Sequence, residues 1–249
     1  MPSIFREPGV ELAYEFLPGA GPVVVFCPGY ASDMAGTKAL TLAENCRARG
    51  QAMLRFDYSG HGQSGGDFLE GTLGAWAADA AHIVREIVPG QPLIIAGSSM
   101  GGWIALLLAL RLPNPVRGII LIAPAADFTE TLLRNSITPE QMAELREKGV
   151  LYQPSEYGGP LPWTLKFLQE GANHLVLGGK ISLTCPVHFL HGMRDDSVPW
   201  ELSLRIAAAL ESDAVRLTFV KDGDHRLSRP EDLALLDSAL NSLLGQNGA

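Results

Sequence analysis

Apolar residues along the chain gather in short runs, separated by longer segments in which apolar positions recur at helical spacing. Several runs are almost continuously apolar, the pattern of parallel strands that are covered on both faces of a sheet. The expected strands are VELAYEF (10–16), PVVVFCP (22–28), QAMLRFD (51–57), PLIIAG (92–97), RGIILIA (117–123), CPVHFLH (185–191) and AVRLTFV (214–220).

Helical segments fill most of the intervals between these runs. The expected helices are TKALTLAENCRARG (37–50), TLGAWAADAAHIVREIV (72–88), residues 100–112, PWELSLRIAAALE (199–211) and PEDLALLDSALNSLLG (230–245). The last begins with proline and ends at glycine, which are both boundary signals. Alternation of strands and helices predicts an α/β protein, with a mostly parallel central sheet between two helical layers.

One region breaks this alternation. From about 127 to 183 no run has a convincing strand pattern, whereas TPEQMAELREKG (138–149) and PWTLKFLQEGANHLV (162–176) favour helices. Thr138 and Pro139 give the first of these a typical helix start. We therefore expect a single domain over residues 1–249, with a helical lid inserted at about 127–183.

The segment GSSMGG (97–102) lies where an expected strand ends and an expected helix begins. A turn sharp enough to hold a nucleophile above a sheet strains that residue and needs small neighbours two positions away on each side. Gly97 and Gly101 flank Ser99 at this spacing, whereas Ser98 lacks the symmetric glycines. Ser99 is thus the candidate nucleophile, and a glycine turn kept only for packing is the alternative.

A serine needs a base, and the base needs an orienting acid. In the α/β-hydrolase fold the chain order is serine, acid, histidine. His225 follows the last expected strand and is the candidate base, while Asp195 in HGMRDDSVPW is favoured as the acid over its neighbour Asp196. Asp127 is a further alternative for the acid, and His191 is expected to brace the acid loop.

Two backbone amides are expected to hold the oxyanion. The amide of Met100 follows the nucleophile at the start of a helix, and that of Tyr30 follows a Pro-Gly turn after the strand PVVVFCP. The glycine-rich stretch after Asp57 superficially resembles a phosphate cradle, but no Gly-Lys-Ser/Thr follows it. Structural support of the nucleophile's surroundings is therefore its better interpretation.

Composition narrows the class of protein without naming a substrate. The formal net charge is −8, which argues against nucleic-acid binding and against attraction to anionic membranes. Three scattered cysteines form no disulfide framework and no metal motif. No apolar run is long enough to span a bilayer, and the N-terminus lacks a signal-peptide pattern. These features favour a cytoplasmic protein without metal or organic cofactor.

Six segments together resemble, in order, a mitochondrial branch of the α/β-hydrolase family: PGYASDMAGTKAL, RFDYSGHGQSGG, TLGAW, GSSMGGW, HGMRDDSVPW and DHR. Members of that branch cleave acyl-protein (palmitoyl) thioesters and acyl glucuronides. The resemblance implies Ser99 as nucleophile, Asp195 as acid and His225 as base. Those members carry an N-terminal targeting extension, whereas this chain starts almost at its first expected strand, so a bacterial or otherwise cytoplasmic relative is expected.

The prediction is hydrolysis of a carboxylic ester or thioester through an acyl-serine, with a small acyl ester, acyl thioester or acylated protein as substrate. Alternatives are carbon-carbon cleavage or perhydrolysis on the same fold, and a ligand-binding receptor without catalysis. A medium or long acyl chain is expected under the lid, with Trp103 or Trp200 nearby. Its pocket is expected to be formed by Phe128, Trp163, Phe167 and Leu168.

Overall fold

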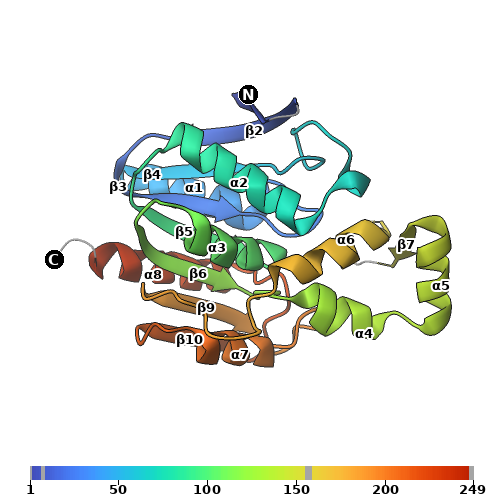
Figure 1. Ribbon diagram of the computed structural model, residues 1–249. Coiled ribbons are helices and arrows are strands. Elements are labelled where there is room, and N and C mark those ends of the chain that lie inside the picture. The colour runs from blue at the N-terminus through green and yellow to red at the C-terminus, as the bar shows by residue number, and fades with distance from the viewer. Residues whose placement is uncertain (1, 7–8, 155–158, 247–249) are drawn as a thin grey trace.

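The computed structural model describes residues 2–6, 9–154 and 159–246 (Figure 1). An eight-stranded sheet runs through the molecule in the order β1-β2-β4-β3-β5-β6-β9-β10. The pairs β1–β2 and β2–β4 are antiparallel, and all other neighbouring strands of this sheet pair in parallel. This mostly parallel sheet confirms the predicted fold class. The strands are β1 (Ser3–Arg6), β2 (Val10–Leu17), β3 (Ala20–Cys27), β4 (Gln51–Phe56), β5 (Leu93–Ser98), β6 (Val116–Ile122), β9 (Val187–Gly192) and β10 (Val215–Val220).

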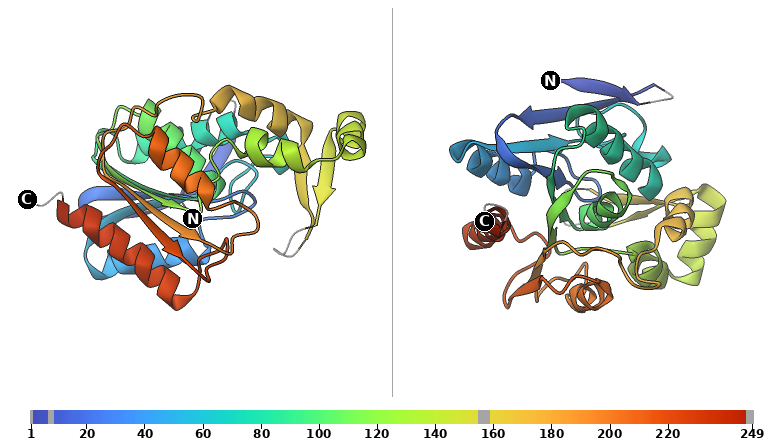
Figure 2. Two further views of the ribbon diagram at one scale, coloured as in Figure 1. Left: turned by 90° about the horizontal axis from the view of Figure 1, so that it is seen from below. Right: turned by 60° about the vertical axis from the view of Figure 1, so that its left-hand side comes forward.

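Helices cover both faces of this sheet (Figure 2). One face carries α1 (Thr37–Ala48) and α8 (Pro230–Gln246); the other carries α2 (Leu73–Ile87), α3 (Met100–Arg111) and α7 (Glu201–Ala209). Side chains alternate along each strand, so Val23 and Val25 pack into one core while Val24 and Phe26 pack into the other. The continuous apolar runs of the sequence reflect this burial on both sides.

β1 was not among the expected strands. It contains four residues, SIFR, and pairs antiparallel with β2 at the edge of the sheet. Four residues are too few to show a period of two, and its two apolar residues are followed directly by arginine. Its place in the sheet depends on the partner strand rather than on a pattern of its own.

The insertion between β6 and β9 projects beyond the end of the sheet where β6 ends (Figure 1). It contains a π-helical turn η2 (Thr129–Leu133), α4 (Arg134–Ser136), α5 (Pro139–Lys148), β7 (Val150–Gln153), β8 (Leu161–Thr164), α6 (Leu165–Gly171) and η3 (Ala172–His174). The insertion contains the expected helices, but the expectation that it has no strand was wrong, since β7 and β8 pair as an antiparallel hairpin. The part of the insertion at 155–158 lies outside the described residues.

The start of α6 explains the error. Thr164 accepts a hydrogen bond from the amide of Phe167 at 3.0 Å and caps the helix there, so Pro162 and Trp163 are left to the strand. Helix α5 follows the prediction closely, because Thr138 and Gln141 form a complete capping box. A hairpin of two four-residue strands carries almost no periodic signal in the sequence.

Asp127 ties the two ends of the insertion together. Its carboxylate accepts hydrogen bonds from the amides of Val176 and Leu177 at 2.9 and 2.8 Å, across about fifty residues of chain. The indole of Trp103 on α3 donates to the carbonyl of His174 at 2.9 Å. These buried and part-buried bonds hold the returning segment against the body of the molecule.

Candidate active site

Ser99 occupies the sharp turn between β5 and α3, with φ +55° and ψ −121°. Such a conformation costs a non-glycine residue about 1–3 kcal/mol, so the surroundings must impose it. A Cβ on Gly97 would lie 2.2 Å from the carbonyl oxygen of Gly101, and one on Gly101 would lie 2.0 Å from that of Cys27. Both contacts are with backbone, which cannot move aside. The glycine spacing of the sequence is therefore a steric requirement of this turn.

The structure brings together the three residues predicted for catalysis. His225 follows β10, and its Nε2 lies 3.0 Å from Ser99 Oγ. Its Nδ1 lies 2.7 Å from the carboxylate Oδ2 of Asp195, which follows β9. Because a carboxylate only accepts hydrogen bonds, Nδ1 carries the ring proton and Nε2 is left to accept from the serine. This is the proton arrangement that a resting general base requires.

The carboxylate of Asp195 has no exposed surface and is fully hydrogen-bonded. Its Oδ1 accepts from the amides of Ser197 and Val198 at 2.9 and 2.7 Å, and its Oδ2 accepts from two imidazoles. Burial by itself would raise the pKa of Asp195, but the hydrogen bonds from His191 and His225 and the attraction of the His225 ring outweigh it, so the pKa is held well below its ordinary value. Asp195 is thus an anion at neutral pH.

The two alternative acids lie elsewhere. Asp196 is exposed, and its carboxylate lies 3.3 Å from the hydroxyl of Ser197 instead of reaching His225. Both carboxylate oxygens of Asp127 accept hydrogen bonds from the backbone amides of Val176 and Leu177 in the insertion. Burial raises the pKa of Asp127, although these amide bonds oppose the shift. Of the three candidate acids, Asp195 is thus the one whose carboxylate lies within hydrogen-bond distance of the His225 imidazole.

His191 contributes a second imidazole to Asp195. Its Nε2 lies 3.1 Å from Asp195 Oδ2 and 3.1 Å from the carbonyl of Val198, and its Nδ1 lies 2.7 Å from Ser203 Oγ. Two acceptors at Nε2 place the proton there, so the Ser203 hydroxyl donates to Nδ1. The ring is completely buried and cross-links the acid loop to α7.

The loop after β3 faces Ser99 and is held by residues at the end of β4 and directly after it. Tyr58 donates its hydroxyl to the carbonyl of Pro28 at 3.2 Å, and Arg55 donates to that of Met34 at 2.5 Å. Asp57 accepts from the amide of Met34 at 2.7 Å. The RFDY segment therefore fixes the shape of this loop, in the supporting role expected of Asp57.

Tyr30 and Met100 line the same pocket as Ser99. The amide of Met100 belongs to the first turn of α3, where backbone N–H groups have no carbonyl partner within the helix. Gly29 lets the loop approach closely, because a Cβ there would lie 3.3 Å from the carbonyl oxygen of Ser98. The chain thus presents two loops from which backbone donors can face an attacked carbonyl.

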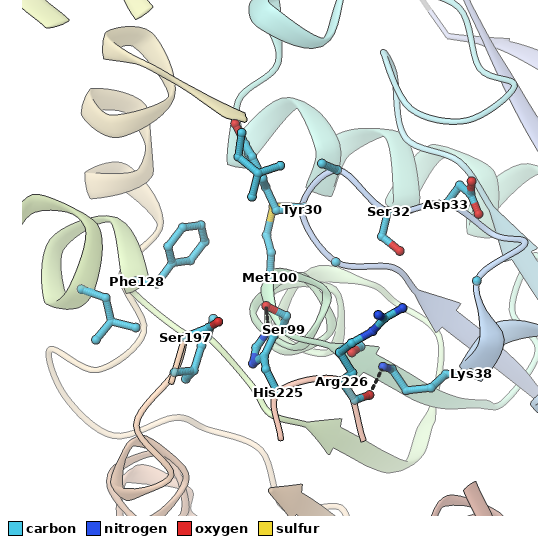
Figure 3. A pocket seen from close by; sticks show the side chains of 18 of the residues that line it. Tyr30, Ser32, Asp33, Lys38, Ser99, Met100, Phe128, Ser197, His225 and Arg226 are labelled. Atoms are coloured by element: carbon cyan, nitrogen blue, oxygen red, sulfur yellow. Dashed lines mark hydrogen bonds between the residues drawn. The ribbon is translucent and has the colours of Figure 1, made fainter. Parts of the chain in front are cut away.

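A pocket of about 480 Å³ opens around Ser99 (Figure 3). This volume is within the ordinary size of small-ligand sites, roughly 300–1,000 Å³. Its apolar lining residues include Phe128, Leu132, Leu133, Leu161 and Trp163, and its polar lining residues include Ser32, Asp33, Thr37, Lys38, Arg226 and Ser228. In Figure 3, Phe128 lies on one side of Ser99, whereas Ser32, Asp33, Lys38 and Arg226 lie on the other. The site therefore has two chemically different halves that meet at the nucleophile.

Of the predicted acyl-pocket residues, Phe128 and Trp163 line the pocket, but Phe167 and Leu168 do not. Both are 1% exposed and lie behind the wall, because the apolar face of α6 packs against the body of the molecule. The Phe167 ring lies 5.7 Å from that of Phe128 and 6.0 Å from that of Trp163, measured between centroids. Phe167 thus supports the wall from behind.

The other two tryptophans considered for the pocket lie outside it. Trp103 is fully buried and packs edge-on against Phe128, while Trp200 packs against Phe219. The polar half, by contrast, was not foreseen. Arg226 directly follows His225 and could have been noticed, but Lys38 is far from every motif of the triad in the sequence.

In the described part of the chain, no group of three or more His, Cys, Asp or Glu residues is arranged to hold a metal ion. None of its helices is long and apolar enough to cross a membrane.

A mostly parallel sheet with a strained serine between strand and helix, and with acid and histidine on later loops, defines the α/β-hydrolase class. A family model described as serine aminopeptidase, S33, matches residues 20–155, more than half of the chain. The chain belongs to this α/β-hydrolase family and is a serine hydrolase.

Curated relatives share most of the chain. Human palmitoyl-protein thioesterase ABHD10, mitochondrial, is 40% identical over 94% of this chain and 76% of its own length. The solved structure of α/β hydrolase domain-containing protein 10 from mouse has a TM-score of 0.90 at 38% identity, over 98% of both chains. A crystal structure of a protein described only as a hydrolase, from Agrobacterium vitis S4, has a TM-score of 0.94 at 39% identity, again over 98% of both.

The expected cytoplasmic location was wrong. The curated human, mouse and rat relatives are named mitochondrial, which contradicts a cytoplasmic location. The expectation depended on composition and on the start of the sequence. Cellular addresses are read by receptors and leave no mark on the packing or surface charge of a folded domain.

Proposed function

We propose that this enzyme hydrolyses carboxylic thioesters and esters through a covalent acyl intermediate on Ser99. The observation that carries the proposal is the 3.0 Å distance between Ser99 Oγ and His225 Nε2. Ser99 lies on a strained turn that places its side chain at the pocket. Asp195 faces the other ring nitrogen at 2.7 Å. Nucleophile, base and acid thus stand in the order that acyl transfer requires.

In the first step His225 Nε2 takes the hydroxyl proton while Ser99 Oγ bonds to the acyl carbon. The amides of Met100 and Tyr30 hold the oxyanion, and each such donor is worth about 3 kcal/mol of barrier. The tetrahedral intermediate collapses, and the protonated imidazole gives its proton to the departing thiol or alcohol. Asp195 stabilises the imidazolium in this step.

In the second step His225 takes a proton from water, whose oxygen attacks the acyl-serine carbon. Collapse of the second tetrahedral intermediate breaks the bond to Ser99 Oγ, which regains the proton from the imidazole. The carboxylic acid leaves and the resting proton arrangement returns. Every proton is accounted for by one base, so the cycle needs no co-reactant other than water.

The apolar half of the pocket supports an acyl chain as the group bound there. Phe128, Leu132 and Trp163 offer it an apolar wall, and each methylene buried there gains about 0.8 kcal/mol. We assign the insertion (127–183) the role of a lid over that chain, within a single domain. The relatives' names support an acyl-protein (palmitoyl) thioesterase, and an acyl-glucuronide-type carboxylesterase is the other form that the proposal takes.

A fluorophosphonate probe tests the chemistry directly. Labelling should be abolished in Ser99→Ala and persist in Ser98→Ala, which changes the neighbouring hydroxyl on the same turn. Hydrolysis of acyl thioesters and p-nitrophenyl esters should fall by about four orders of magnitude in Asp195→Asn. Asp196→Asn, the matched control, should keep most of the activity. Full hydrolysis by Ser99→Ala would refute the acyl-serine.

A further inference from the structure

Two cationic side chains line the polar half of the pocket. Lys38 lies in the first turn of α1, and Arg226 directly follows His225 (Figure 3). The Arg226 side chain extends on the Lys38 side of Ser99, and the ammonium of Lys38 donates to the carbonyl oxygen of Arg226. Both side chains therefore stand on the side of the nucleophile that is opposite Phe128.

The carboxylates around Lys38 are engaged by other groups. Asp224 accepts from the amides of Arg226 and Leu227 at 3.1 and 2.9 Å, and Asp232 pairs with Arg229 at 2.9 Å. Across the described residues, no carboxylate is within ion-pair distance of the Lys38 ammonium. Its positive charge is therefore directed to the pocket without a salt bridge of its own.

The groups around Lys38 favour the binding of an anion next to it. Burial, together with the nearby Arg226 charge, lowers the pKa of Lys38 to about 8, although the attraction of Asp224 and Asp232 opposes the shift. Asp33 lies on the adjoining loop, and one of its carboxylate oxygens accepts a hydrogen bond from the amide of Ala35 at 2.8 Å. A bound anion would relieve the repulsion between the two cations.

We propose that Lys38 and Arg226 form a subsite for an anionic group, a carboxylate or phosphate, on the leaving-group side of the scissile bond. The inference rests on the proposed function, because the acyl chain is assigned there to the apolar half. The leaving alcohol or thiol then extends past Ser99 toward these two residues. Substrates of this enzyme are thus esters or thioesters whose leaving group bears negative charge near the reacting bond.

The test uses octanoyl esters of 4-hydroxybenzoate and 4-hydroxybenzamide, which differ in the charge of the leaving group. The measured quantity is the ratio of kcat/KM for the charged over the neutral ester. In the wild type at pH 7 the charged ester should be preferred, and Lys38→Met and Arg226→Gln should each lower the ratio about tenfold. Lys180→Met removes an exposed lysine outside the pocket and should leave the ratio unchanged.

Further measurements test the role of the Lys38 charge and identify the kind of anion that binds. The wild-type preference should decline as pH rises through about 8, where Lys38 loses its proton, whereas that of Lys38→Met should stay level. A 4-phosphonophenyl ester distinguishes phosphate from carboxylate as the favoured anion. Octanoyl-cysteine peptides with aspartate or asparagine beside the thioester show whether a peptide can supply the charge.

A ratio that is the same in wild type, Lys38→Met and Arg226→Gln would overturn the subsite. If the neutral ester is cleaved in a Ser99-dependent manner but this ratio does not change, only the subsite fails. If neither ester is cleaved and Ser99→Ala behaves as the wild type, the proposed function itself fails. Arg226→Lys should retain part of the preference, since it keeps the charge and loses the planar donor geometry.

Discussion

At the scale of single residues, the most connected group of the site is the carboxylate of Asp195. Each of its oxygens accepts two hydrogen bonds, and Oδ2 is shared between the imidazoles of His225 and His191. A carboxylate held by four donors cannot rotate when one partner changes its protonation state. We therefore interpret His191 as a positioning residue that keeps Oδ2 aimed at His225.

His191→Phe should lower kcat about ten- to hundredfold with little change in KM, because the loss of a buried hydrogen bond to a charge is worth roughly 1.5–3 kcal/mol. Steady-state kinetics on a p-nitrophenyl ester measures the split, with thermal unfolding as a check on the fold. Ser203→Ala, which keeps the imidazole and removes only its far partner, should cost far less. An unaltered kcat in folded His191→Phe would show that the amides of Ser197 and Val198 suffice.

At the scale of elements, the loop after β3 and the insertion meet at Tyr30. Its ring stacks on Trp163 of β8 with centroids 4.3 Å apart, and its hydroxyl donates to the carbonyl of Pro162. The same residue supplies a proposed oxyanion amide. The hairpin of the insertion therefore contacts the loop after β3 directly, and the proposed acyl wall packs against the residue that supplies a proposed oxyanion amide.

Trp163→Ala should remove both the stack and part of the acyl wall. KM for a long-chain thioester is expected to rise about tenfold, through lost apolar contact and aromatic pairing, while an acetyl ester changes less than about threefold. The measurement compares kcat and KM of the wild type and each variant on substrates whose acyl chains increase in length. Tyr152→Ala, on the same hairpin but with 55% of its residue surface exposed, is the matched control. An equal loss for every chain length would assign Trp163 to the oxyanion loop alone.

At the scale of the whole molecule, the site joins loops from both halves of the sheet. Ser99 stands at its centre, and Asp195 and His225 come from the last two strands. Charged interactions within the site consequently contribute to the stability of the entire fold, since the loops meet only when the sheet is complete.

Acid unfolding makes this link measurable. The pKa of Asp195 is lower in the folded than in the unfolded chain, where it is about 3.9. Folding is therefore stabilised by this group above about pH 4, and the contribution is lost as pH falls through the lower folded value. Denaturant unfolding should show Asp195→Asn less stable than wild type at pH 6, with the difference shrinking toward pH 2. Asp196→Asn, exposed and outside the network, should follow the wild type throughout.

The sequence by itself determined the features that depend on local spacing. Continuous apolar runs predicted the inner strands, because burial on both faces demands them. The glycines around Ser99 predicted the turn, because no larger side chain is accommodated there. The loops of Asp195 and His225 were located by their position after strands. At each of these positions the physical requirement lies within a few residues of chain.

Only the tertiary structure decided what distant segments do to one another. It turned Phe167 away from the pocket and set Asp127 to close the insertion. It also placed Lys38 beside Arg226, 188 residues further along the chain. Short strands such as β7 and β8 were decided at this level as well. Such contacts depend on the packing of complete layers, and no local pattern of residues encodes which surfaces will face each other.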